Sequence, residues 1–268
     1  MMREARQHPA QGLQRQDIKI TDIQVTPLSY THDGEYLWRC GGLYVWKADA
    51  ALVQVFTDQG VVGIAEGSPY RGPDRLKQYT DRYIRPLLLG ANIFDVDLLT
   101  NNQGHNSVAE GAWAGVNNAL WDAIGKAVEQ PVYKLLSDEV SPSNQVRIYA
   151  SGGVCHAWYD KGEEELIEEA LRYKAAGYDT FKFRNGTSWK HSGMTMEQYI
   201  VVLERLREAV GPEFKLVLEK FPWPYEQILK ELCPVLEALR FYWFEEPVEH
   251  TGPVALEQHL AINEAMPS

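Results

Sequence analysis

The sequence predicts an α+β domain followed by an α/β domain whose strands are parallel. Apolar and polar residues alternate from Asp17 to Gly67, as in half-buried strands, and a helical pattern begins near Pro73. From Val146 onward, strand and helix patterns alternate at a spacing of about 30 residues, which is typical of parallel strands joined by crossover helices. The predicted divisions are a mobile lead-in over residues 1–16, the α+β domain over 17–142 and the α/β domain over 143–268.

The first half of the α+β domain reads as strands. Residues 18–28 alternate, and residues 51–57 and 61–67 flank Asp58-Gln59-Gly60, a hairpin signal because glycine tolerates the positive φ of such a turn. The stretch from Ser29 to Lys47 is rich in aromatic residues and contains glycine. It reads either as a functional loop or as a further pair of strands.

The second half of the α+β domain reads as helices. Pro73 suits the first position of a helix. The strongest helical pattern covers residues 108–128, where apolar residues recur every three or four positions. Gly111 and Gly115 lower the helix propensity slightly but permit close contact with a neighbouring element. Residues 137–144, which include Pro142, read as a linker.

The α/β domain shows four strand patterns, each followed by a helix pattern. Gly177 and Gly211 close the first two helices. The predicted strands cover residues 146–152, 180–184, 214–220 and 241–247, and the predicted helices cover residues 163–176, 196–210, 225–239 and 254–265.

Composition excludes several classes of protein. The 268 residues are 45% hydrophobic and 24% charged, which excludes wholesale disorder. A net charge of −11 argues against general binding to nucleic acid or to anionic membranes. Cys40, Cys155 and Cys233 fit no zinc or disulfide pattern, so a reducing cytoplasm is expected. No apolar run is long enough to span a membrane, and the lead-in lacks the apolar core of a signal peptide.

Charged residues stand at the ends of three successive strands, where ligands bind in proteins of this class. Lys182 and Arg184 are two apart and therefore face the same way, while Glu219 and Glu245 end the next two strands. Carboxylates that converge at one mouth repel each other unless a hard cation such as Mg²⁺ neutralises them. The residues alone leave two interpretations open, a shared site or separate solvated loop residues.

Three segments carry a resemblance to a known family. They are residues 117–136, with the sequence NNALWDAIGKAVEQPVYKLL, residues 177–184 with Lys-Phe-Arg, and residues 243–247 with Trp-Phe-Glu-Glu-Pro. Together they resemble the enolase superfamily in its mandelate racemase and muconate-lactonizing branch, over about residues 17–268.

The resemblance implies that the α+β domain is a capping domain and that the α/β domain is part of a TIM-like (β/α) barrel. It also implies Mg²⁺ and removal of a proton α to a substrate carboxylate, with the metal stabilising the ene-diolate. By position, Glu219 and Glu245 match the first two metal ligands of the family. Lys182 matches the first lysine of its catalytic pair, and Arg184 replaces the second.

Two departures from the family pattern limit what is expected. Arg184 is a poor base, because guanidinium stays charged, but its fork suits binding a carboxylate or orienting a hydroxyl. The sequence also stops near the point where the family begins its fifth barrel strand, which would bring a third metal ligand. A half barrel has open strand edges. We therefore expect a fragment, a truncated product or a chain that completes itself as a homo-oligomer.

The leading hypothesis is a Mg²⁺-dependent acid-sugar dehydratase, impaired in this chain, that acts on a small hydroxy-carboxylate. Lys182 and Arg184 are the candidate catalytic residues, and residues 29–47 and 68–73 would close over the ligand. The alternatives are a racemase or cycloisomerase of the same superfamily, a non-catalytic remnant, and a Schiff-base lyase that uses Lys182. No nucleic acid or membrane partner is expected.

Overall fold

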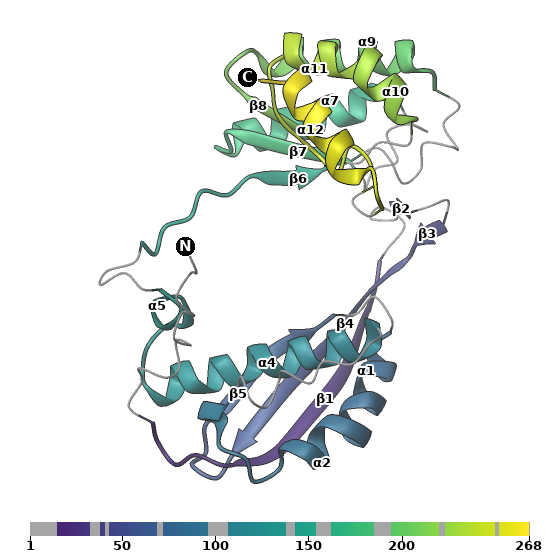
Figure 1. The fold of residues 1–268 in the computed structure, drawn as a ribbon. Coiled ribbons are helices and arrows are strands. Elements are labelled where there is room, and N and C mark those ends of the chain that lie inside the picture. The colour runs from purple at the N-terminus through teal and green to yellow at the C-terminus, as the bar shows by residue number, and fades with distance from the viewer. Residues whose placement is uncertain are drawn as a thin grey trace, which may run out of the picture. The chain divides into compact units, whose positions relative to one another are not determined.

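A computed structural model of the chain describes residues 15–32, 38–40, 43–68, 72–95, 107–137, 143–153, 162–184, 194–219, 223–249 and 252–267. The chain divides into two compact units (Figure 1). One comprises Met1–Thr31 and Lys47–Val146, and the other comprises His32–Trp46 and Arg147–Ser268. No helix in the described residues is long and apolar enough to cross a membrane.

The first unit contains an antiparallel three-stranded sheet in the order β1-β4-β5. Its strands are β1 (Ile20–Thr31), β4 (Lys47–Thr57) and β5 (Val62–Gly67). The hairpin predicted at Asp58–Gly60 is confirmed, because β4 and β5 pair antiparallel and Gly60 has a φ of 75°. Between β1 and β4, in the segment that belongs to the second unit, the alternative of a strand pair is the correct one: β2 (Trp38–Cys40) and β3 (Leu43–Val45) pair antiparallel.

Helices cover one face of this sheet (Figure 1). The long helix predicted over residues 108–128 is confirmed as α4, and Pro73 occupies the first turn of α1 as expected. Close packing against the sheet explains the glycines, since a Cβ added at Gly115 would lie 2.8 Å from the Cα of Gly67. The helical segments are α1 (Pro73–Tyr79), η4 (Thr80–Ile84), α2 (Arg85–Leu88), η5 (Ile93–Asp95), α4 (Ser107–Ala127) and α5 (Val132–Leu135).

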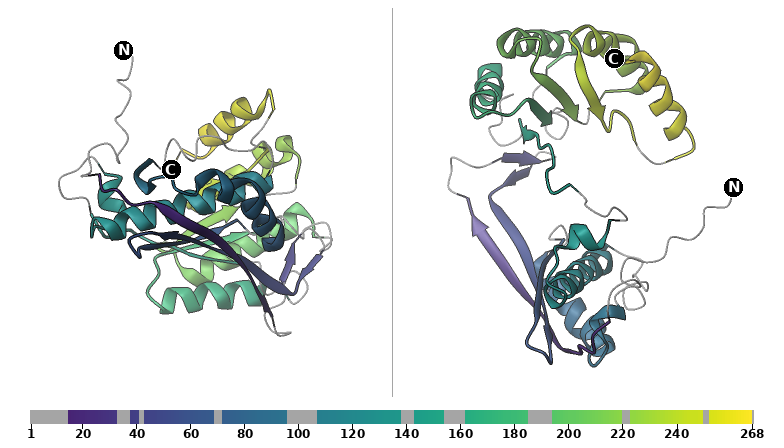
Figure 2. Two further views of the ribbon diagram at one scale, coloured as in Figure 1. Left: turned by 90° about the horizontal axis from the view of Figure 1, so that it is seen from below. Right: turned by 90° about the vertical axis from the view of Figure 1, so that its left-hand side faces the viewer.

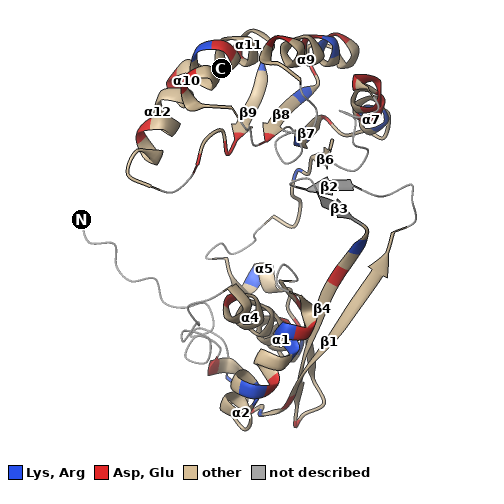
Figure 3. Ribbon diagram, turned by 90° about the vertical axis from the view of Figure 1, so that its right-hand side faces the viewer, with Lys and Arg blue, Asp and Glu red and all other residues tan. Residues whose placement is uncertain are grey.

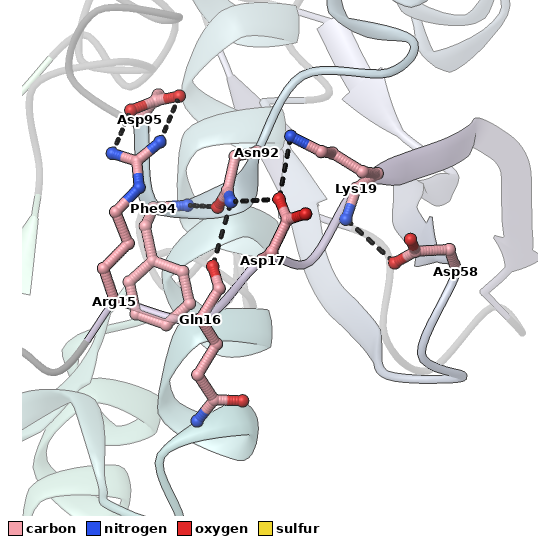
Figure 4. Close-up of polar contacts among 8 residues, drawn as sticks. All are labelled: Arg15, Gln16, Asp17, Lys19, Asp58, Asn92, Phe94 and Asp95. Atoms are coloured by element: carbon pink, nitrogen blue, oxygen red, sulfur yellow. Dashed lines mark hydrogen bonds and ion pairs between the residues drawn. The ribbon is translucent and has the colours of Figure 1, made fainter.

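A polar cluster fastens the start of the described chain to the segment around η5 (Figure 4). The guanidinium of Arg15 donates to both carboxylate oxygens of Asp95, and the side-chain amide of Asn92 donates to the carbonyl of Gln16 and to Asp17. Arg15 and Gln16, the last residues of the expected mobile lead-in, are thus held in place. Residues 1–14 and most of the predicted linker lie outside the described residues.

The second unit contains four parallel strands in the order β6-β7-β8-β9, with helices on one side (Figures 1 and 2). The predicted parallel arrangement is confirmed. The strands are β6 (Ala150–Gly152), β7 (Thr180–Arg184), β8 (Lys215–Glu219) and β9 (Phe241–Glu245). The helical segments are α7 (Glu163–Ala175), α9 (Met196–Val210), α10 (Tyr225–Gln227), η6 (Ile228–Leu232), α11 (Cys233–Ala238) and α12 (Ala255–Ala265).

The first strand of this sheet is shorter than predicted. Residues 146–149 carry a strand pattern but lie outside the sheet, and only Ala150–Gly152 pairs with β7. Val146 and Ile148 are exposed. Among the described residues, no neighbouring strand or core covers these two apolar side chains.

Two helices contain a π-helical turn just before a proline. The turn η4 precedes Arg85-Pro86, and the turn η6 interrupts the single helix predicted over residues 225–239 just before Cys233-Pro234. Proline has no N–H to donate to the preceding turn. The wider turn lets the residue before each proline bond to a carbonyl five positions back.

The side chains of β7 divide between the two faces of the sheet. Phe181 and Phe183 are fully buried in a cluster with residues of the helices, while Lys182 and Arg184 lie on the opposite face. From the sequence, a half barrel is also expected to leave an apolar interior uncovered, including Phe181, Phe183 and the side chains around Trp243; for the two phenylalanines this expectation is wrong. The helix layer covers them. Side chains alternate between the two faces of a strand, so both phenylalanines face the helices, and Lys182 and Arg184 face the other side of the sheet.

Candidate active site

The carboxyl ends of β7, β8 and β9 bring four charged residues side by side. Arg184 is opposite Glu219 in the parallel pairing of β7 with β8, and Glu219 is opposite Glu245 in the pairing of β8 with β9. Figure 3 shows acidic residues at the ends of β8 and β9. Strand pairing therefore brings together the charged strand ends that the sequence predicted to form a polar mouth.

Lys182 joins the two carboxylates. Its Nζ lies 2.7 Å from Oε2 of Glu219 and 2.8 Å from Oε1 of Glu245. The side chains of Lys182 and Glu219 are only 11% and 8% exposed, whereas that of Glu245 is 36% exposed. The expected convergence of both carboxylates on one point is present, and their role as metal ligands stays a prediction.

Arg184 holds the other oxygen of Glu219. Its Nε donates to Oε1 of Glu219 at 2.7 Å, and its terminal nitrogen donates to the same oxygen. Glu219 thus has Lys182 on one oxygen and Arg184 on the other. In this arrangement Arg184 orients the carboxylate of Glu219, and its expected role toward a substrate stays a prediction.

The charges in this cluster shift two pKa values. Burial acts to lower the pKa of Lys182, but hydrogen bonds and attraction from Glu219 and Glu245 outweigh it, so the pKa is raised. Burial likewise acts to raise the pKa of Glu219, and the hydrogen bonds from Arg184 and Lys182 outweigh it, so the pKa is lowered. Both shifts favour the charged forms, and the network is a set of mutually neutralising ions.

A β-bulge in β9 places Glu245 in the cluster. Leu216 pairs with Phe241, but the next pair is Val217 with Trp243, so Tyr242 is an extra residue on β9. With regular pairing, Glu219 would lie opposite Phe244, and Glu245 would face the helix layer because side chains alternate. The bulge therefore turns Trp243 and Glu245 toward Lys182, as bulges beside active sites commonly do.

Two aromatic side chains flank the charges, and sequence analysis did not assign them to the site. The indole Nε1 of Trp243 donates to Oε2 of Glu245 at 3.2 Å. Trp243 packs edge to face against Tyr149, with ring centroids 5.4 Å apart, and Nζ of Lys182 lies 6.0 Å from the centroid of Tyr149. The sequence did contain a signal for Trp243: it stands two residues before Glu245, and residues two apart on a strand face the same way.

The donor set fits a hard divalent cation. Two carboxylates from neighbouring strands face one position, and oxygen ligands of this kind are those that Mg²⁺ prefers. No cluster of three His, Cys, Asp or Glu side chains that could hold a metal occurs within the residues that the structure describes. The loops expected to close over a ligand, residues 29–47 and 68–73, lie partly outside them.

Comparison with known proteins agrees with this architecture. Residues 43–137 match the family model of the mandelate racemase / muconate lactonizing enzyme N-terminal domain, and residues 165–267 match the enolase C-terminal domain-like model. A mandelate racemase/muconate lactonizing protein from Paracoccus denitrificans PD1222, solved in complex with magnesium, superposes with a TM-score of 0.71 at 23% identity. The match covers 93% of this chain and 64% of that one.

Two curated relatives are sugar-acid dehydratases by name. Arabinonate dehydratase of Saccharolobus solfataricus is 28% identical over 242 residues, which cover 86% of this chain and 61% of the relative. D-xylonate dehydratase of Haloferax volcanii is 27% identical over 251 residues, covering 87% of this chain and 55% of the relative. The chain thus spans somewhat more than half the length of these relatives. With both family models matched in order, and with an α+β domain followed by a sheet of parallel strands, the chain belongs to the mandelate racemase/muconate lactonizing enzyme branch of the enolase superfamily.

Proposed function

We propose that this chain carries residues of an acid-sugar dehydratase site, which removes the α-proton of a hydroxy-carboxylate and eliminates water. The observation that carries the proposal is the convergence of Lys182, Glu219 and Glu245 at the ends of three adjacent parallel strands. The names of the two curated relatives support a sugar acid as the substrate class.

Glu219 and Glu245 are the residues that would hold Mg²⁺. When bound, the metal would supply positive charge that stabilises the anion formed beside the substrate carboxylate. Within the part of the chain that the structure describes, these two carboxylates offer few ligands to an ion that demands octahedral coordination. We therefore expect weak metal affinity and low turnover from this chain.

Lys182 and Arg184 would act directly on the substrate. Once its ammonium has lost a proton, the neutral Lys182 amine takes the α-proton, and the electron pair of the C–H bond forms a C=C bond as the β-hydroxyl leaves. The re-formed ammonium gives its proton to the leaving hydroxyl, which departs as water. The enol then becomes a 2-keto-3-deoxy acid, so the substrate loses one H₂O without oxidation or reduction. Arg184 orients the substrate carboxylate or a hydroxyl through guanidinium N–H groups other than those that donate to Glu219.

Arg184 also separates this proposal from the racemase alternative. A two-base racemase needs a second group that gains and loses a proton, and guanidinium does so poorly because it stays charged. A dehydratase needs only one base and a proton for the leaving hydroxyl.

The scattered cysteines of the sequence support a cytoplasmic setting.

The test is to incubate the chain with Mg²⁺ and a panel of sugar acids, and to detect 2-keto-3-deoxy products with semicarbazide. We expect slow, Mg²⁺-dependent dehydration that is lost in Lys182→Ala and Glu245→Gln. Lys215→Ala is the matched control, because Lys215 begins β8 at the opposite end from the site. Activity that survives Lys182→Ala would refute the assignment, and metal binding without any turnover would favour the non-catalytic remnant.

A further inference from the structure

We infer that Trp243 is a positioning residue for Glu245, an inference that rests on the proposed function of Glu245 as a metal ligand. Trp243 has no charge and no place in the proton transfer described above. Its indole N–H nevertheless donates to Oε2 of Glu245 at 3.2 Å, while Oε1 of the same carboxylate lies 2.8 Å from Lys182. Each oxygen of Glu245 therefore has a different partner.

Glu245 needs such a partner more than Glu219 does. Glu219 is 8% exposed and held by cations on both oxygens, whereas Glu245 is 36% exposed and ends its strand. A glutamate has three side-chain torsions, and a half-solvated one samples many orientations. The indole N–H selects those in which Oε1 points to the position shared with Glu219.

The indole itself is fixed by its surroundings. Its ring contacts the rings of Tyr149, at 5.4 Å between centroids, and Tyr242, at 5.2 Å. Trp243 and Glu245 are two residues apart and so share one face of β9, and the bulge at Tyr242 turns that face toward Lys182. The donor is thus a rigid group on a strand, which is the kind of support that orients a metal-binding carboxylate.

The first test measures the hydrogen bond without any metal. In ¹⁵N-labelled protein, the indole N–H resonance of Trp243, assigned by its disappearance in Trp243→Phe, should move upfield in Glu245→Ala. The matched control is Glu246→Ala, the adjacent carboxylate, which should leave that resonance in place. If the indole resonance does not move in Glu245→Ala, the inference is overturned, whether or not the protein binds metal.

The second test measures metal affinity by calorimetry with Mg²⁺ alone. Trp243→Phe keeps an aromatic ring against Tyr149 but removes the donor, and we expect about a tenfold loss of affinity, as is common when an outer partner of a ligand is removed. Tyr242→Phe, on the same strand, should bind like the unchanged chain. Equal affinity in Trp243→Phe and the unchanged chain overturns the inference. If the unchanged chain binds no Mg²⁺ at all, the proposed function fails, and the indole resonance still decides the role of Trp243.

Discussion

Lys182 is the residue on which the candidate site depends, because its ammonium group lies between carboxylates from two different strands. Two carboxylates in a largely buried site repel each other, and a cation between them relieves that repulsion. The ammonium of Lys182 lies between these carboxylates, 2.7 Å from an oxygen of Glu219 and 2.8 Å from an oxygen of Glu245. The residue therefore stabilises the folded chain as well as being the candidate base.

Replacing Lys182 by methionine should destabilise the chain, because it leaves two carboxylates facing each other without a shared cation. We expect a loss of about 3 kcal/mol in the free energy of unfolding, the lower end of the range for breaking a buried ion pair, since Arg184 still neutralises Glu219. Urea unfolding measures it. Lys215→Met is the control, with an expected loss under about 1 kcal/mol. Unchanged stability in Lys182→Met would contradict the ion network.

The lowered pKa of Asp22 predicts how the stability of the first unit depends on pH. Hydrogen bonds from Gln24 and then Arg85 outweigh burial and lower the pKa of Asp22 below its usual value. A lowered pKa in the folded state stabilises the fold above the unfolded pKa of about 3.9, and this stabilisation is lost as the pH falls through the folded value. The melting temperature of Asp22→Asn should therefore lie below that of the unchanged chain at pH 7 and approach it near pH 3.

The control for this pH dependence is Glu66→Gln, which alters an exposed carboxylate of β5. Its difference from the unchanged chain should vary less between pH 7 and pH 3. A difference for Asp22→Asn that stays constant over this range would show that the variant acts by some means other than the charge of Asp22.

At the scale of the elements, the bulge in β9 decides which face Glu245 occupies. Deleting Tyr242 should restore regular pairing with β8 and turn Trp243 and Glu245 toward the helix layer. We expect this variant to lose the Mg²⁺ binding measured by calorimetry, whereas Tyr242→Phe keeps both the residue count and the binding. A deletion variant that folds and binds Mg²⁺ like the unchanged chain would show that the bulge has no such role.

The contact of α4 with β5 makes a second prediction about elements. Alanine has a helix propensity about 1 kcal/mol better than glycine, so Gly115→Ala would stabilise an isolated helix. Here the added Cβ would lie 2.8 Å from Gly67 Cα and 2.9 Å from a methyl of Val53, too close without movement of the backbone. We expect net destabilisation of about 1–2 kcal/mol by urea unfolding, since overpacking outweighs propensity.

Gly111→Ala gives the comparison for Gly115. Its added Cβ would meet the Cβ of Ser68 at 3.1 Å, a milder contact. The cost should therefore be smaller than for Gly115→Ala. A Gly115→Ala variant more stable than the unchanged chain would mean that the helix and the sheet are not packed this closely.

At the scale of the whole molecule, the open side of β9 predicts self-association. In the described part of the chain, β9 pairs only with β8, and a cavity of about 540 Å³ beside it is lined by side chains that include Tyr242, Phe244 and Leu260. On α12, Leu256 and Leu260 are 72% and 54% exposed and lie four residues apart, on one helix face. Burying such a surface is favourable at about 25 cal/mol per Å².

We therefore expect light scattering to give a mass that rises with protein concentration, and Leu256→Lys with Leu260→Lys to lower it. Val201→Lys is the matched control, because Val201 is a half-exposed apolar residue of another helix, α9. A monodisperse monomer at all concentrations would contradict the prediction. So would a change caused equally by Val201→Lys.

The sequence by itself determined most of the elements and the identity of the charged site residues. Helix and strand patterns are local, so the apolar period identified α4 and the hairpin at Gly60, and it placed β7, β8 and β9 within a few residues. Lys182, Arg184, Glu219 and Glu245 could be selected because each ends a strand, and the ends of parallel strands meet at one edge of a sheet. The strand predicted at residues 146–152 shows the limit, because its first four residues lie outside the sheet: an apolar pattern does not by itself supply a neighbouring strand.

The tertiary structure alone decided how those residues meet. The extra residue at Tyr242 is invisible in the sequence of β9, because a bulge exists only relative to the register of the neighbouring strand. It sets Glu245 opposite Glu219 and brings the indole of Trp243 to its carboxylate. Lys182 bridges the two carboxylates for the same reason. Register and side-chain contacts join residues far apart in the chain, and they are fixed only when the whole sheet and its covering helices pack together.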